Sequence, residues 1–107
     1  MAEDPGEYRL RPIQPADQSF LWEMLYQAIF TPPGAPAPAR SITQQPELAR
    51  YVEGWGRPDD LGFLVETAAD AKPVGGAWLR LLTGEGRGYG YVDDRIPELS
   101  IAVLPPY

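Results

Sequence analysis

The sequence predicts an α+β fold: a mainly antiparallel sheet with two N-terminal helices, in the order β-α-α-β-β-β. Three observations predict it. Residues 20–29 repeat apolar side chains at helical spacing, residues 61–66 alternate as in a strand, and residues 74–82 and 98–104 form apolar runs. A chain of 107 residues has the length of a single domain.

Composition narrows the class of partner. Hydrophobic residues make up 44% of the chain, close to the globular norm of about 45–50%. The net charge of −6 argues against a nucleic-acid partner, because binding phosphates requires clustered lysine and arginine. The same charge argues against binding to an anionic membrane surface.

Two residue types are absent, and each absence excludes chemistry. Without cysteine the chain forms no disulfide and no thiolate metal site. Without histidine it lacks the commonest metal ligand and any Ser-His-Asp or Cys-His mechanism, so we expect no metal. The N-terminus is acidic and no apolar run approaches about 18 residues, so we expect a cytoplasmic protein rather than a secreted or membrane-spanning one.

The first elements are expected within residues 8–54. Residues 8–13 predict a short strand with Arg9 and Arg11 on its solvent face. A helix is expected to begin at Pro15, where the carboxylate of Asp17 can reach back to a free backbone N–H.

The first helix is expected to present two stripes of side chains. Its apolar face is Phe20, Leu21, Met24, Leu25, Ala28 and Ile29. Trp22, Tyr26 and Phe30 form the adjacent stripe, which either contacts the core or walls a substrate cleft. The proline-rich residues 31–40 predict an extended loop, and residues 46–54 a second helix ended by glycine.

The rest of the chain predicts three strands, over residues 61–66, 74–82 and 98–104. The glycine-spaced residues 83–95 connect the last two strands. Their glycines match no phosphate-binding motif, so we interpret this segment as a flexible connection.

Acidic residues cluster before and at the start of the last predicted strand. Asp93 and Asp94 lack the spacing of a calcium loop and are interpreted as a solvated loop end. Glu98 opens an apolar strand, where it is either an edge charge or a partly desolvated general base. Trp78 and Arg80 share one face of the preceding strand, which lies against the core, a helix or a pocket.

Three motifs together resemble GNAT-type N-acetyltransferases. Residues 8–17, YRLRPIQPAD, resemble the opening strand and first helix start of that family. Residues 73–80, PVGGAWLR, are similar to its third strand, and residues 97–107, PELSIAVLPPY, to its fourth strand. The motifs occur in the family's order and extend over nearly the whole chain, so we treat residues 1–107 as one partial N-acetyltransferase-like domain.

The resemblance implies an acetyl-CoA site along the last strand. In the family, the backbone of this strand pairs with the pantetheine arm of acetyl-CoA, which points to Ile101, Ala102 and Val103 here. An acid on the same strand often serves as general base for the acceptor amine, and Glu98 falls near that position.

The acceptor site of the family is shaped by the first two helices and their connection. Carried over, this implies Trp22, Tyr26 and Phe30 as substrate-binding residues, and we add Trp78 from the central strand. The acceptor itself is expected to be a small-molecule or peptide amine.

The chain departs from the family pattern at Tyr107, where the glycine loop that binds the pyrophosphate is expected to begin. The prediction is therefore the N-terminal half of an enzyme that transfers an acetyl group from acetyl-CoA to a primary amine. It is a truncated piece, or a half that pairs with a second fragment. Two alternatives remain: a non-catalytic binding, regulatory or oligomerisation module with this fold, and an unrelated interaction domain. Exposed apolar surface is expected around Leu81, Ile101 and Val103, and with it a homo-oligomer or a paired fragment.

Overall fold

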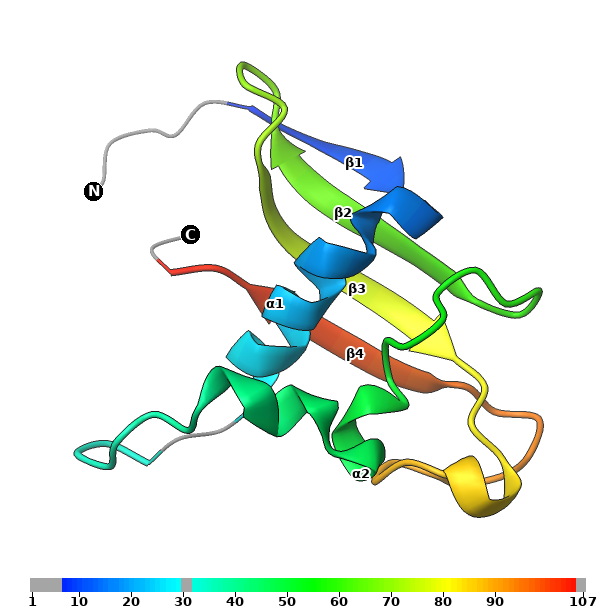
Figure 1. Ribbon diagram of the computed structural model, residues 1–107. Helices are drawn as coiled ribbons and strands as arrows, with labels where there is room; N and C mark the ends of the chain where they lie inside the picture. Colours follow the sequence, from blue (N-terminus) through cyan, green and yellow to red (C-terminus); the bar gives the residue numbers. More distant parts are fainter. Residues whose placement is uncertain (1–6, 30–31, 106–107) are drawn as a thin grey trace.

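The sheet confirms the predicted class. A computed structural model describes residues 7–29 and 32–105 (Figure 1). Within these residues the chain forms a four-stranded sheet in the order β1-β2-β3-β4, with antiparallel neighbours throughout. The strands are β1 (Tyr8–Pro12), β2 (Leu61–Thr67), β3 (Pro73–Arg80) and β4 (Glu98–Val103).

The first helix begins as its sequence predicts, with one difference. A 3-10 turn, η1 (Pro15–Asp17), precedes α1 (Gln18–Ala28), so the α-helix proper starts three residues after Pro15. The carboxylate of Asp17 accepts a hydrogen bond from the amide of Gln14 at 2.8 Å, which confirms the expected N-terminal contact.

The second helix is shorter than predicted. It consists of α2 (Pro46–Ala49), preceded by the unpredicted 3-10 helix η2 (Arg40–Gln44). Hydrogen-bonded turns continue the chain to Gly54, whose φ of +65° ends them as expected for glycine. A further 3-10 turn, η3 (Gly84–Gly86), lies in the connection between β3 and β4.

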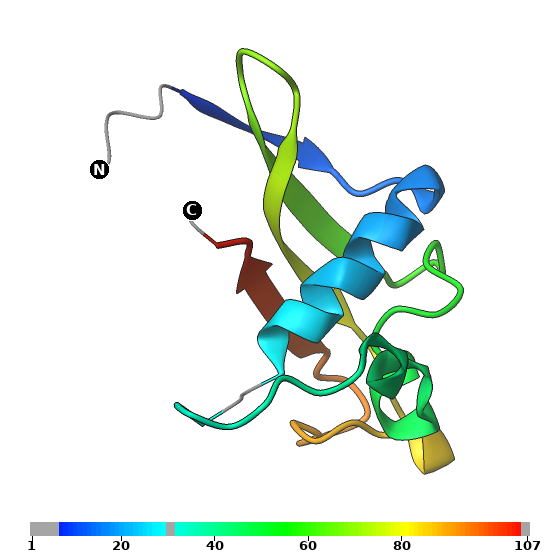
Figure 2. The same cartoon turned by 60° about the vertical axis from the view of Figure 1, so that its left-hand side comes forward.

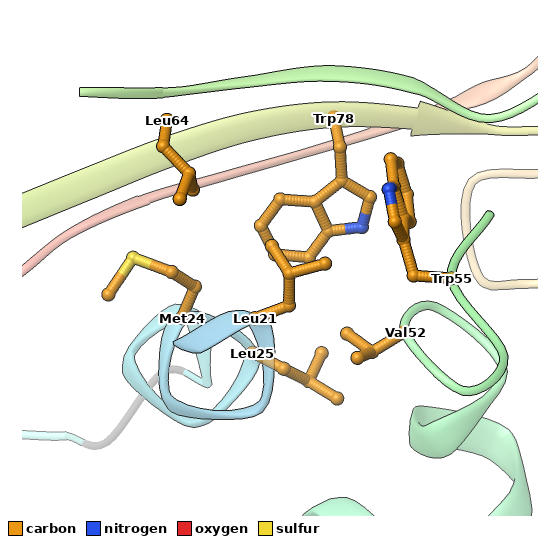
Figure 3. Close-up of a cluster of buried hydrophobic side chains, with 7 residues drawn as sticks. All are labelled: Leu21, Met24, Leu25, Val52, Trp55, Leu64 and Trp78. Atoms are coloured by element: carbon orange, nitrogen blue, oxygen red, sulfur yellow. The ribbon is translucent and has the colours of Figure 1, made fainter. Parts of the chain in front are cut away.

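The core lies between α1 and one face of the sheet (Figures 1 and 2). The members of the core cluster are less than 9% exposed, and their side chains converge in Figure 3: Leu21, Met24, Leu25, Val52, Trp55, Leu64 and Trp78. The three α1 residues are spaced i, i+3, i+4, so they form one stripe along the helix.

The predicted orientation of β1 is wrong. Arg9 and Arg11 lie on the same side as Ile13, which packs against the core, and both arginines form ion pairs with Glu66. Tyr8 and Leu10 point to the opposite side and are exposed. Alternation along a strand places residues 9, 11 and 13 on one face, so Ile13 cannot share a face with Tyr8 and Leu10.

No helix in the described part of the chain combines the length and apolar character needed to cross a bilayer.

Candidate functional site

A pocket of about 660 Å³ opens beside β4, bounded by the C-terminal end of α1, by α2 and by the connection that leads into β4. Most of its wall is apolar. The lining residues are Leu25, Ala28, Ile29, Leu48, Tyr51, Tyr89, Gly90, Val92, Ile96, Pro97, Glu98, Leu99, Ser100 and Ile101.

Glu98 supplies the one charged side chain among these lining residues. It is 6% exposed, and its carboxylate accepts three hydrogen bonds. The Tyr51 hydroxyl and the Gly90 amide donate to Oε1 at 3.0 and 2.9 Å, and the Gly88 amide donates to Oε2 at 2.8 Å. These three hydrogen bonds fix residues 88–90 against the start of β4.

Tyr51 connects this arrangement to the segment after α2. Its hydroxyl donates to Glu98 and accepts a hydrogen bond from the Tyr89 amide at 2.6 Å. Burial is the main cause that raises the pKa of Tyr51 above its ordinary value; the Tyr89 amide opposes this effect and Glu98 reinforces it. The phenol therefore stays protonated at neutral pH and keeps donating to the carboxylate.

Gly88 is required by the same packing. A Cβ atom at this position would collide with the Tyr51 hydroxyl and with Oε1 of Glu98. Gly86, two residues earlier, has open space where its Cβ would lie. The loop therefore depends on the absence of a side chain at one of these two glycines.

The outer edge of β4 forms the second part of the site. The Leu104 amide donates to the Val74 carbonyl at 2.8 Å, which sets the phase of the ladder between β3 and β4. Because antiparallel ladders alternate, the backbone groups of Leu99, Ile101 and Val103 point away from β3. Leu99 and Ile101 also line the pocket, so its apolar wall adjoins a strand edge with open hydrogen-bonding groups.

This geometry divides the predicted cofactor-binding residues. Ile101 and Val103 direct their backbone outward, as expected for a strand that pairs with a ligand. The prediction for Ala102 is wrong. Its backbone N–H and C=O point toward Gly76 of β3, because hydrogen-bonded and outward-facing residues alternate along an antiparallel strand.

The predicted substrate-binding residues do not gather at the pocket. Trp78 is 1% exposed and its indole N–H donates to the Tyr51 carbonyl at 2.9 Å, so it is a core residue with no surface for a substrate. Tyr26 donates to the Pro38 carbonyl, and its ring lies 4.2 Å from the Arg40 guanidinium.

Trp22 is half-buried against the core cluster and is not among the pocket residues. Phe30 lies outside the described residues. The end of α1 and the residue after it instead contribute Leu25, Ala28 and Ile29 to the pocket wall, all from the apolar face that the sequence predicts.

Arg80 has a structural role. It is 1% exposed and pairs with Asp60 through Nε and Nη2 at 3.0 and 2.7 Å. Its Nη1 donates to the carbonyls of Arg50 and Glu53 at 3.1 and 2.6 Å. The guanidinium thereby ties β3 to the turns after α2.

The pKa of Asp60 reports the same network. Burial raises it, but hydrogen bonds from Arg80 and from the amides of Gly56 and Arg57 outweigh burial and hold it below the ordinary value. Among the described residues, no group of three or more acidic, cysteine or histidine side chains comes together where it could hold a metal ion.

Sequence reasoning missed Tyr51 and Tyr89. Tyr51 shares a helical face with Leu48, which signals burial but not a hydroxyl aimed at a residue 47 positions away.

No family model, curated protein or solved structure matches this chain.

Proposed function

We propose that the pocket and the outer edge of β4 bind acetyl-CoA, and that the chain promotes transfer of the acetyl group to a primary amine. The observation that carries the proposal is the juxtaposition of an open strand edge, an apolar pocket and a buried, hydrogen-bonded carboxylate at residues 98–103. The resemblance of residues 8–17, 73–80 and 97–107 to GNAT-type enzymes supports it, and the cysteine-free composition suits a cytoplasmic setting.

The residues of the site fit the pantetheine arm of acetyl-CoA, but the pocket lining has no basic side chain to bind the pyrophosphate. An arm that carries amides can pair with the backbone of Leu99, Ile101 and Val103 in the manner of an added strand. No lysine or arginine occurs among the residues that line the pocket. We therefore expect acetyl-CoA to bind this chain more weakly than about 1 μM, as isothermal titration calorimetry can measure.

Glu98 is assigned as the base through Oε2, which accepts one hydrogen bond and retains a lone pair. In the proposed reaction an ammonium substrate loses a proton to Oε2, directly or through a water molecule. Acetyl-CoA supplies the activated acyl carbon: the amine nitrogen forms a bond to it while the carbon–sulfur bond breaks. The second proton on nitrogen then passes to the departing thiolate.

A second candidate function rests on the same three hydrogen bonds. Donors to both carboxylate oxygens make Glu98 a suitable anchor for residues 88–90. In this candidate the protein binds an extended ligand at β4 without transferring a group, and Glu98 serves the shape of the pocket alone.

Glu98→Gln, with Tyr51→Phe as the matched control, separates the two candidates. If Glu98 is the base, Glu98→Gln lowers acetyl transfer at pH 7 by about 10²–10⁴-fold and leaves acetyl-CoA affinity nearly unchanged. Its defect shrinks at high pH, where the free amine is abundant, while Tyr51→Phe keeps most of the activity.

If Glu98 only anchors the loop, both variants lower stability and ligand affinity together, and the pH–rate profile of any residual activity keeps its shape. Gly88→Ala, compared with Gly86→Ala, tests the loop independently. The first should disrupt the pocket, costing about 1–3 kcal/mol of stability, and the second should be nearly neutral.

A further inference from the structure

The face of the sheet opposite α1 carries exposed, large apolar side chains from three of its strands. Seven of them are 41–68% exposed: Tyr8, Leu10, Leu61, Phe63, Leu99, Ile101 and Val103. We call this surface the bare face. The register of the sheet aligns these residues with Pro12, Val65, Gly75, Ala77 and Leu79 on the same face.

None of these strand residues is charged. The opposite face, by contrast, carries Arg9, Arg11, Glu66, Arg80 and Glu98. Contiguous apolar surface of this extent on a single chain marks a site of interaction, because exposing it to water is unfavourable.

The bare face is not flat: it has a hollow along β3 between bulkier side chains of the neighbouring strands. A hollow of about 260 Å³ runs over the central strand β3, where the side chains are small. The register pairs Phe63 of β2 with Ala77 of β3, and Val65 with Gly75. Phe63 and Val65 of β2 therefore each lie level with a small residue of β3, whereas Leu61 lies level with Leu79.

We propose that the bare face is covered by the bare face of a second copy of this chain. The two copies are related by a twofold axis that is parallel to the strands, midway between the two stacked sheets and above the gap between β2 and β3. Rotation about such an axis places β2 of each copy over β3 of the other and preserves the level of every residue. Phe63 then lies over Ala77 of the second copy and Val65 over its Gly75, so at these two levels each bulky side chain fills the space above a small residue of the other copy. Stacked sheets of this kind pack about 10 Å apart.

The outer strands match as well. The same rotation places β1 over β4 of the second copy. Leu10 and Val103 lie at one level, because Leu10 is paired with Val65, Val65 with Gly75, and Gly75 with Val103. An isologous contact therefore uses all four described strands.

The area is sufficient for a stable dimer. With roughly 180 Å² of surface for each large residue, the seven exposed fractions correspond to roughly 700 Å² per copy. Two copies would bury about 1,400 Å², within the range of about 1,200–2,000 Å² found for specific interfaces. Because the face is uncharged, no ion has to be desolvated.

Sedimentation velocity over a range of concentrations tests the proposal. The wild-type chain should be dimeric at micromolar concentration, and Phe63→Lys should be monomeric while it keeps its circular dichroism spectrum. Val92→Lys is the matched control, because Val92 is 72% exposed and lies in the connection before β4. It should remain dimeric. A monomeric wild-type chain would overturn the proposal and would mean that the bare face binds a different partner. A Phe63→Lys chain that remains dimeric would also overturn it.

Cross-linking tests the register even if Phe63→Lys fails to fold. The chain has no cysteine, so one introduced thiol is unique. A mixture of Phe63→Cys and Ala77→Cys chains, treated with a short thiol-to-thiol reagent, should give a mixed cross-linked dimer, because the proposed axis places these two positions over one another. A mixture of Val92→Cys and Ala77→Cys should give at least ten-fold less. Equal yields from the two mixtures contradict the proposed arrangement.

Discussion

On the face that α1 covers, β3 presents Trp78 and Arg80, whereas on the bare face the same strand presents Ala77 and Leu79. The covered face buries charged side chains, and these have hydrogen-bond partners. Among the described residues, no buried polar side-chain atom lacks such a partner. The bare face has no charge to satisfy and leaves its apolar side chains in water. The comparison teaches that one face holds the chain together, while the other has the composition of an interface.

The largest effect is expected from breaking the charge pair of the covered face. Asp60→Asn leaves the Arg80 guanidinium buried without its carboxylate, and removal of one partner of a buried pair costs about 3–5 kcal/mol. Urea unfolding measures this change. Asp59→Asn is the control, since Asp59 is exposed and its substitution should cost less than about 0.5 kcal/mol. Equal losses in the two variants would show that the pair does not hold the fold.

The next effect contrasts two leucines on opposite faces. Leu64 is fully buried and Leu10 is 68% exposed. Leu64→Ala should cost about 2–5 kcal/mol, because it leaves a cavity in the core. Leu10→Ala should cost less than about 0.5 kcal/mol when unfolding is measured in dilute solution, where the chain is monomeric. A large loss for Leu10→Ala in dilute solution would mean that the bare face stabilises the monomer.

The smallest effect is the response of the covered face to acid. The pKa of Asp60 in the folded chain lies below its unfolded value. Its contribution to stability is therefore present above the unfolded pKa, near 4, and is lost as pH falls toward the folded pKa. Urea midpoints measured from pH 7 to about pH 2.5 should fall more steeply for the wild type than for Asp60→Asn. Parallel curves would remove Asp60 from the acid response.

The sequence predicts the order of elements because local patterns carry that information. The helical stripe of Leu21, Met24 and Leu25, the Asp17 contact and the strand alternation are all set by neighbours a few residues apart. The shortened second helix departs from prediction because the turns after α2 are held by distant partners. The carbonyls of Arg50 and Glu53 accept hydrogen bonds from Arg80 of β3.

The candidate site is less predictable because it also depends on partners that are distant in the sequence. Glu98 and the outer edge of β4 follow from one strand, but Tyr51 reaches Glu98 across 47 residues. Trp78 is wrongly predicted as a substrate residue because alternation shows which residues share a face, not which face is covered. The bare face likewise requires the register of all four strands before its side chains can be placed together.

Dependence of the unfolding midpoint on protein concentration tests the central claim most directly, namely that a second copy covers the bare face. If folded chains associate through this face and unfolded chains do not, the thermal midpoint rises between about 1 and 100 μM by mass action. Phe63→Lys should remove the rise. A wild-type midpoint that stays constant over this range would contradict the account.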